Sequence, residues 1–495
     1  MAKSLGKKSK KKLFLWGIPA LLVGLVLVLV AVYFWQIRLQ KPVEVNMAHH
    51  HHEMSADMAS MPDHSHASSA VVACEAIVET DTTAPVKTYE LVASKTVISL
   101  GNGKTKEAWT FNGTSPGPEL RVTEGDKVVV TLKNKDIEDG VTLHWHGINV
   151  PCSQDGVAGV SQDAVAPGEQ FTYSFVADEP GTYWYHSHQM SSIQARMGLL
   201  GSIVVLPKST GAKTEIMDVN AIYQELDSTP LLNGSTEGLT LDGHPGDRVR
   251  LRLTNAGNGT LRFRVDGASF QVAAMDGHEL NEPGPLQDVE VPVGAGQRYD
   301  LLFRIPDSHK VVVRSDSLKN LPITIGEGTV PPESEGKEKF SFVDYGSPLA
   351  EGQERKPDAD RSFELKLGQS LFVNTINGRS FHEIPPMNVK EGETVRITIV
   401  NEGGGYHPFH IHGHTFRVWS KNGVPLTGSP VYLDTLLTTK GDRFEVTLTA
   451  DNPGLWMAHC HNLEHASMGM SMMLNYEGVT TSYTVGTRSG NLPDL

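Results

Sequence analysis

The fold is decided by a segment that occurs three times in this chain of 495 residues, as EGDKVVVTLKN at 124–134, PGDRVRLRLTN at 245–255 and EGETVRITIVN at 391–401. Each copy is a glycine turn followed by alternating residues, and each ends in asparagine. Alternation with a period of two is typical of a β-strand with one buried face. A second segment that leads into another alternating strand is found at 167–171, 295–299 and 440–444. The chain therefore contains one β-domain in triplicate.

No long helical period interrupts these repeats after the N-terminal region. Short strands at regular intervals with glycine and proline turns indicate a sandwich or a barrel. We expect an all-β chain with domains at 81–208, 209–345 and 346–485, a number that suits the chain length. A composition of 39% hydrophobic and 20% charged residues is that of a globular protein, and the net charge of −14 argues against nucleic acid as a partner.

The repeats serve as an internal alignment of the three copies. Three equivalent residues begin nine or ten positions after the asparagine that ends the first repeated segment. They are His144, Trp145 and His146 in the first copy, Arg264, Val265 and Asp266 in the middle copy, and His410, Ile411 and His412 in the third. Eighteen residues after the glycine of the second segment stand His186, Ser187 and His188, then Arg314, Ser315 and Asp316, and finally His459, Cys460 and His461. Residues i and i+2 of a strand share a face, so the outer copies supply four pairs of imidazoles. We interpret the middle copy as a spacer without metal ligands.

A thiol, several imidazoles and a thioether lie close together in the third copy, a donor set that suits copper. Cys460 points to the opposite face from its two histidine neighbours and can serve a second metal centre. With His407, His465 and an axial Met470 it forms the two-histidine, one-cysteine set of an electron-transfer copper. Ser187 stands in the place of this cysteine in the first copy, which therefore cannot build such a site. Eight further imidazoles are too many for one metal and fit a three-copper cluster.

Four motifs carry a family resemblance, namely His-Trp-His-Gly from 144, His-Ser-His from 186, His-Pro-Phe-His-Ile-His-Gly-His from 407 and His-Cys-His from 459. In this order they resemble the copper signatures of the three-domain multicopper oxidases, the family of laccases and cuprous oxidases. The similarity extends over about residues 85 to 480. It implies three consecutive cupredoxin-like Greek-key β-sandwich domains and four coppers per chain.

The resemblance also implies a role for each ligand. It assigns type 1 copper to His407, Cys460, His465 and Met470, type 2 copper to His144 and His410, and the type 3 pair to His146, His186, His188, His412, His459 and His461. His414 extends the third motif without a ligand role, and we expect it to be structural.

In such a protein a reducing substrate gives single electrons to the type 1 copper, with His465 as the entry point. The electrons pass through Cys460 to the three-copper cluster, where four of them reduce O2 to water. Asp155 matches an aspartate that the family places near the cluster to supply protons, although an Asp-Gly turn is an equal interpretation. Ala466 stands where many bacterial relatives have a glutamate, and the orientation of Glu464 is unknown, so the second proton-relay group stays open.

The substrate is open between phenols and Cu(I), because no methionine-rich insert is evident between the third and fourth motifs. A copper-homeostasis protein that acts mainly on Cu(I) is the alternative to a laccase. A copper nitrite reductase is built from the same domain but lacks the four histidine pairs and the third domain. A non-catalytic relative would have lost ligands that are present here. Met472 and Met473 suit either Cu(I) handling or a buried strand face.

The N-terminus differs from the rest of the chain. A basic cytoplasmic tail at 1–12 precedes an apolar run, and we expect a transmembrane anchor at 13–37. The run ends in Tyr33, Phe34 and Trp35 without a small-residue cleavage site, although a signal peptide cut at an unusual place is the alternative. Both interpretations export the protein, and the first leaves it membrane-anchored with its catalytic domains outside the cytoplasm.

A linker rich in methionine and histidine is expected at 38–80. Its candidate donors are Met47, His49, His50, His51, His52, Met54, Met58, Met61, His64 and His66. This composition cannot bury a core and predicts disorder. Thioether favours Cu(I) and imidazole favours Cu(II), so the tract either captures copper or is a polar tether. Cys74 and Cys152 form a disulfide or remain two buried thiols.

Overall fold

The computed structural model describes residues 44–48, 71–81, 83–208, 216–350, 355–370 and 373–494. The predicted basic tail at 1–12 and the predicted anchor at 13–37 lie outside the described residues. Within the described ranges, no helix has the length and hydropathy that a membrane span requires.

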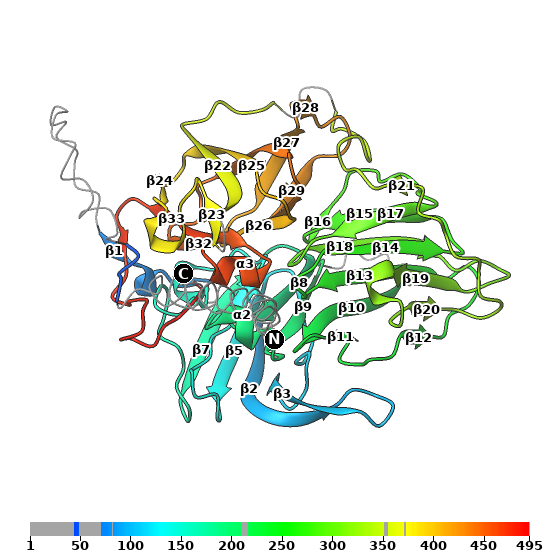
Figure 1. The fold of residues 1–495 in the computed structure, drawn as a ribbon, viewed down its shortest axis with the longest axis horizontal. Coiled ribbons are helices and arrows are strands. Elements are labelled where there is room, and N and C mark those ends of the chain that lie inside the picture. The colour runs from blue at the N-terminus through cyan, green and yellow to red at the C-terminus, as the bar shows by residue number, and fades with distance from the viewer. Residues whose placement is uncertain are drawn as a thin grey trace, which may run out of the picture. The chain divides into compact units, whose positions relative to one another are not determined.

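The regular secondary structure of the described chain is almost entirely β-strand, in three successive pairs of sheets that Figure 1 colours from blue and cyan through green to yellow and red. One sheet of the first pair has the order β3 (Thr105–Phe111), β2 (Val86–Ser99), β5 (Asp126–Asn134) and β7 (Gln170–Ala177). The other has the order β4 (Leu120–Thr123), β9 (Leu200–Leu206), β8 (Gly181–His186) and β6 (His144–His146).

The middle pair consists of two six-stranded sheets. The first runs β11 (Thr229–Leu232), β10 (Ile216–Leu226), β13 (Arg248–Asn255), β18 (Arg298–Arg304), β15 (Phe270–Met275) and β16 (His278–Glu279). The second runs β12 (Leu239–Leu241), β20 (Ile323–Ile325), β19 (Val311–Ser315), β14 (Leu261–Asp266), β17 (Val289–Val293) and β21 (Glu338–Lys339).

The third pair follows the same plan. One sheet runs β23 (Val373–Ile376), β22 (Arg361–Ser370), β25 (Thr394–Asn401), β31 (Arg443–Thr449), β27 (Phe416–Lys421) and β28 (Val424–Pro425), with β29 (Val431–Leu433) also on β27. The other runs β24 (Met387–Val389), β33 (Ser471–Tyr476), β32 (Leu455–Cys460), β26 (His407–Ile411) and β30 (Thr435–Thr438).

The remaining elements are short. They are the helices α2 (Ser191–Gln194) and α3 (Leu463–Ser467), and the 3-10 turns Cys74–Ala76, Cys152–Gln154, Asp316–Leu318 and Phe381–Glu383. A two-stranded sheet joins β1 (Val72–Ala73) to β34 (Val479–Thr480) in parallel.

The repeated segments occupy equivalent places in the three sheet pairs. The strands β5, β13 and β25 come from the first repeat, and each pairs in parallel with the strand that precedes it in its sheet, β2, β10 or β22. Each also pairs antiparallel with the strand from the second repeat, which is β7, β18 or β31. The predicted triplication is therefore present in the fold.

The asparagine that ends each repeat closes the loop that follows it. The side-chain amides of Asn134, Asn255 and Asn401 donate to backbone carbonyls three or four residues further along the chain, at 2.8, 2.8 and 3.0 Å. All three side chains are buried, where an unpaired amide would be costly. Each loop leads into β6, β14 or β26, so the asparagine helps to place the strand that carries the motif residues.

The predicted linker at 38–80 is structured at both ends where it is described, so the prediction of disorder is wrong for these parts. Val45 forms a β-bridge with Val485, and the carbonyl of Met47 accepts a hydrogen bond from Asn475 at 3.0 Å. Met47 is 5% exposed and belongs to the core rather than to a copper-binding tract. The other methionines and the histidines of the tract lie outside the described residues.

Cys74 and Cys152 form a disulfide, with a Cα–Cα distance of 5.3 Å and a sequence separation of 78. The bond joins the 3-10 turn Cys74–Ala76 to the turn Cys152–Gln154. The latter turn ends at Asp155. Disulfides persist in oxidising compartments, so the bond agrees with export.

Candidate metal centre

The eight histidines of the four pairs meet between the first and third sheet pairs. They lie on, or one or two residues beyond, the strands β6, β8, β26 and β32. Each is at most 2% exposed. The rings of His144 and His412 stack at a centroid distance of 3.7 Å, and those of His146 and His410 at 3.9 Å. The first and third copies therefore build one site together.

These site histidines, as we call the eight, fall into groups of three. Within each group the nitrogens available as ligands lie within 4.8 Å of one another. The groups are His146, His186 and His461, then His188, His412 and His459, and finally His144 and His410 together with His146. Two groups contain the six residues predicted for the type 3 pair, and the last contains the two predicted for type 2 copper.

The hydrogen bonds of the site histidines test whether a metal fits. Nδ1 of His144 hydrogen-bonds to Asp155, Nδ1 of His186 to the carbonyl of Ser187, and Nδ1 of His410 to the carbonyl of Asp434. In each of these rings Nε2 is buried and has no hydrogen-bond partner among the described residues.

His146 shows the reverse arrangement. Its Nε2 is bonded and its Nδ1 is not, while both ring nitrogens of His188 and His461 lack partners within the described part of the chain. Buried polar atoms without partners are rare in proteins, and ligating histidines usually bond through the other ring nitrogen. The unpaired nitrogens converge within the groups of three, together with Nε2 of His412 and Nε2 of His459, which lie 3.1 Å apart.

Burial sets the protonation of these rings. It is the largest cause of the lowered pKa values of His146, His186, His188, His412 and His461, and the neighbouring histidines lower them further. Burial lowers the pKa of His459 to about 3. Neutral imidazole is the form that binds a metal, so the rings are ready for ligation near neutral pH.

Asp155, predicted from the sequence, lies against two site histidines. Its carboxylate is 1% exposed and accepts from Nδ1 of His144 at 3.1 Å and from Nδ1 of His412 at 3.0 Å. Gly156 follows with a φ of +73°, and a Cβ there would lie 1.7 Å from the carbonyl oxygen of Leu143. The turn and the contact to the histidines thus occur together.

A second buried carboxylate, Asp434, was missed by sequence reasoning. Its Oδ1 accepts from Nε2 of His146 at 3.0 Å, and its carbonyl oxygen accepts from Nδ1 of His410 at 2.9 Å. Arg298 and these histidines hold the pKa of Asp434 well below its ordinary value despite burial. The available signal was a charged residue within the apolar run from Val431 to Leu437.

The cysteine site lies in the third sheet pair. Sγ of Cys460 is 3.7 Å from Nδ1 of His407 and 3.7 Å from Nδ1 of His465, and these two nitrogens are 3.2 Å apart. Met470 is buried, and its backbone carbonyl accepts from the amide of Cys460 at 3.0 Å. Three donors therefore converge on one point, and the fourth predicted ligand, Met470, directly precedes β33.

Burial raises the pKa of the Cys460 thiol to about 12 and lowers that of His407 to about 4. A thiol in this environment becomes a thiolate only when a cation compensates its charge. The donor set of one sulfur and two imidazoles is that of an electron-transfer copper.

The other predicted residues have structural partners. His414 bonds to the carbonyl of His412 through Nδ1 and to the hydroxyl of Tyr476 through Nε2, so it is not available as a ligand. Glu464 lies exposed on α3, 3.5 Å from Arg196. Met472 and Met473 are adjacent residues of β33 that point to opposite faces of the strand, and both are buried.

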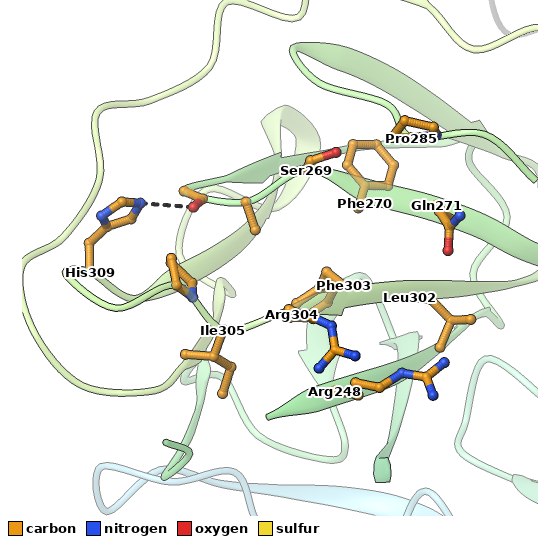
Figure 2. A pocket seen from close by; sticks show the side chains of 13 residues that line it. Arg248, Ser269, Phe270, Gln271, Pro285, Leu302, Phe303, Arg304, Ile305 and His309 are labelled. Carbon is orange, nitrogen blue, oxygen red and sulfur yellow. Dashed lines mark hydrogen bonds between the residues drawn. The ribbon is translucent and has the colours of Figure 1, made fainter. Parts of the chain in front are cut away.

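The hollow in Figure 2 belongs to the middle sheet pair and contains none of these residues. It has a volume of about 630 Å³, and Arg248, Phe270 and Arg304 are among its lining residues. Its one histidine, His309, bonds to the carbonyl of Gly267 at 2.8 Å. The lining includes no carboxylate or thiol, so the hollow offers no copper ligand set.

Three sequence models, each described as multicopper oxidase, match residues 92–210, 208–316 and 354–478. The chain is 26% identical to Multicopper oxidase MmcO of Mycobacterium tuberculosis over 77% of this chain and 85% of that protein. It is 27% identical to Laccase-1 of Botryotinia fuckeliana over 82% of this chain and 85% of that protein. The crystal structure of a multi-copper oxidase from Pseudomonas thermotolerans matches with a TM-score of 0.67 and 30% identity, covering 80% of this chain and 100% of that one.

Proposed function

The chain belongs to the multicopper oxidase family, and we propose that the site histidines and the cysteine site hold the coppers of this family. The protein is a copper-dependent oxidoreductase that couples one-electron oxidations of a reducing substrate to the four-electron reduction of O2 to water. Copper, when bound, supplies the one-electron chemistry. The convergence of unpaired buried nitrogens carries the proposal.

We assign ligands by the groups that the rings form. Type 2 copper takes His144 and His410, the type 3 pair takes His146, His186 and His461 on one side and His188, His412 and His459 on the other, and type 1 copper takes His407, Cys460, His465 and Met470. His459 and His461 flank Cys460 in the chain, which gives a covalent path of three residues between the two centres. His465 is the most exposed of the four type 1 ligands, and we therefore place the entry of electrons from the reducing substrate there. The three copies extend, in this proposal, over 81–208, 209–345 and 346–485.

Asp155 and Asp434 have different roles in this site. Both orient imidazoles by accepting from the nitrogen that faces away from the metal position. The paired arginine keeps Asp434 ionised, whereas Asp155 contacts only histidines and backbone in its hydrogen bonds among the described residues. We propose Asp155 as the residue that passes protons to the reduced oxygen.

Two buried histidines, His188 and His414, provide a test of the ligand assignment. His188→Gln removes a ring with two unpaired nitrogens, whereas His414→Gln removes a ring with both nitrogens bonded. The parent and His414→Gln should bind about four coppers per chain, and His188→Gln should lose trinuclear copper while it keeps the blue absorption. Equal copper contents in the two variants would contradict the assignment.

We further propose that the protein acts outside the cytoplasm, anchored by residues 13–37. The apolar run and its basic flank support the anchor. The disulfide between Cys74 and Cys152 supports an oxidising compartment. Membrane fractionation of the full chain, compared with a chain that starts after residue 37, tests the anchor, and full-length protein that remains in the aqueous fraction would refute it.

For the substrate we propose Cu(I), delivered by the methionine- and histidine-rich tract, with phenols as the second candidate. The tract supports Cu(I) because thioethers prefer it and because the tract is joined to the enzyme. The relative named as a laccase supports phenols. Oxygen uptake should be measured with Cu(I) and then with a phenol.

The experiment is sharpened by deleting residues 49–66 and keeping Met47, which is part of the core. We expect slower Cu(I) oxidation at limiting copper and unchanged phenol oxidation by fully loaded enzyme. If both rates are unchanged, the tract is a tether and the laccase function is favoured.

A further inference from the structure

One fully buried side chain of the middle sheet pair touches both of the other pairs. Arg298 begins β18, and its Nη1 and Nη2 donate to the two carboxylate oxygens of Asp434, in the third pair, at 2.9 and 2.6 Å. Its Nε donates to the carbonyl of Thr182, on β8 of the first pair, at 2.9 Å. A bidentate arginine–carboxylate pair fixes both position and orientation. Arg298 therefore joins the three sheet pairs at the edge of the copper site.

Asp434, held in place by Arg298, is hydrogen-bonded to two site histidines. It bonds to Nε2 of His146 through its side chain and to Nδ1 of His410 through its carbonyl. These bonds leave Nδ1 of His146 and Nε2 of His410 unpaired and directed to the ligand groups. The carboxylate thus decides which nitrogen of His146 is offered to a metal.

A second carboxylate, Asp276 of the middle sheet pair, is hydrogen-bonded to Arg298 and to the residue after Asp434. Asp276 is fully buried, accepts from the backbone amide of Arg298 at 3.0 Å and from that of Thr435 at 3.1 Å, and lies 3.5 Å from Nη1 of Arg298. Thr435 in turn donates its hydroxyl to Asp434 at 2.7 Å. Asp276 is therefore bound to both sides of the Arg298–Asp434 pair.

The Arg298–Asp434 pair occupies space that is free only because residue 147 is a glycine. Gly147, which directly follows His146, has a φ of +89°, and a Cβ there would lie 2.2 Å from Nη2 of Arg298 and 2.6 Å from Oδ2 of Asp434. The glycine of the His-Trp-His-Gly motif is thus required because the arginine of another sheet pair passes beside it. This steric relation is independent of the hydrogen bonds.

We propose that Arg298, supported by Asp276, is a positioning residue for the trinuclear copper site. It sets Asp434 so that His146 and His410 present the correct nitrogens, and the middle copy thereby takes part in copper binding without a ligand of its own. This inference rests on the proposed function, because it takes His146 and His410 as copper ligands.

Arg252 provides a matched control for the test. It is also buried in the middle sheet pair, on β13, and it bonds to Asp218, Asp300 and the hydroxyl of Thr182. Among the described residues, no hydrogen bond joins Arg252 to a site histidine or to Asp434. Arg252→Met and Arg298→Met therefore remove the same chemistry from the same interface, and only the second reaches the copper site.

The measurements are copper content in competition with a chelator, the type 1 absorption and the electron paramagnetic resonance signal of type 2 copper. In Arg298→Met we expect the trinuclear site to bind copper about 10- to 100-fold more weakly, with the type 1 band kept. Arg252→Met should match the parent in copper content. Parent-like trinuclear binding in Arg298→Met, or an equal loss in Arg252→Met, would overturn the proposal.

Arg298→Lys decides the matter if Arg298→Met does not fold. Lysine keeps the charge but cannot make two parallel hydrogen bonds to one carboxylate. We expect bound copper with an altered type 2 signal, and an unchanged signal would overturn the proposal. A parent protein that binds type 1 copper alone would instead refute the proposed function, so the two failures are distinguishable.

Discussion

The middle and third sheet pairs have different side chains at equivalent positions of equivalent strands. In the third pair His410 of β26 faces His459 of β32, and in the middle pair Arg264 of β14 faces Arg314 of β19. The first pair repeats the arrangement with His144 opposite a histidine of β8. The internal alignment made from the sequence is thus correct in register as well as in order.

The polar groups at these positions are compensated differently in the two regions. Arg314 pairs with Asp266, and Arg264 pairs with Asp316, so opposite charges neutralise each other within the middle pair. In the third pair burial favours neutral rings, and the unpaired nitrogens of His410 and His461 belong to the groups of three. The same strand pair therefore holds either a set of ion pairs or half of a metal site, and the side chains alone decide which.

The largest effect is expected at Cys460, where the middle copy has a serine. Cys460→Ser should abolish the absorption at roughly 600 nm, where copper–thiolate charge transfer lies, together with substrate oxidation. The trinuclear copper should remain, because none of the site histidines is changed. Visible spectra and copper content check this, and a variant that stays blue would refute the assignment.

Among the residues that the structure describes, Asp155 has no arginine partner of the kind that Asp266 has in the middle copy. Asp155→Asn should slow oxygen reduction about 10- to 100-fold, with copper retained, because it alters a group bonded to two ligand rings. Single-turnover reoxidation by O2 provides the measurement. An unchanged reoxidation rate would show that Asp155 acts only as a turn residue.

The copper-free protein should lose stability as the pH falls from about 6.5 to about 4. Burial lowers the pKa of His407 to about 4 and that of His459 to about 3, while an unfolded chain has ordinary histidines near 6.5. In this window the unfolded state binds more protons, so the free energy of unfolding decreases with decreasing pH.

Thermal unfolding of the copper-free protein at a series of pH values checks this prediction. His459→Gln should flatten the dependence, since it removes one group with a depressed pKa. A melting temperature that is constant between these pH values would contradict the effect of burial on the site histidines.

The smallest effect on copper is expected from the middle copy itself. Replacing both Asp266 and Asp316 with Ala should leave about four coppers per chain. It should lower the free energy of unfolding by about 1–3 kcal/mol, because Arg314 loses its bond to Asp266, whereas Arg264 loses Asp316 but keeps Ser334 and Glu333. Copper analysis and chemical denaturation are the measurements. Loss of a copper without unfolding would show that the copies were misaligned.

Much of the site was predictable because its residues recur at fixed spacings. The i, i+2 histidines share a strand face by backbone geometry, and the triplication showed which copies retained them. Asp434 and Arg298 follow no such spacing. They are 136 residues apart, and Asp434 is 288 residues from His146. Contacts of this kind depend on how the sheet pairs meet, so the interpretation of the middle copy as a spacer was incomplete.

The N-terminal segments show the same limit. The composition of 38–80 predicts disorder, yet Met47 lies in the core and Cys74 is bonded to Cys152. One apolar or thiol side chain is a small part of a polar segment's composition, but it is sufficient to attach the segment to a complementary surface. Composition averages over residues, whereas packing acts on single side chains.

The sequence by itself determined the all-β class, the threefold repeat, the copper chemistry and the histidine pairs that converge at the site, because these depend on local periodicity and on donor type. Only the tertiary structure decided the pairing of the cysteines, the partner nitrogen of each imidazole and the place of Arg298, Asp276 and Asp434 behind the site. These features arise where three sheet pairs meet, and the distances that define them join residues far apart in the chain.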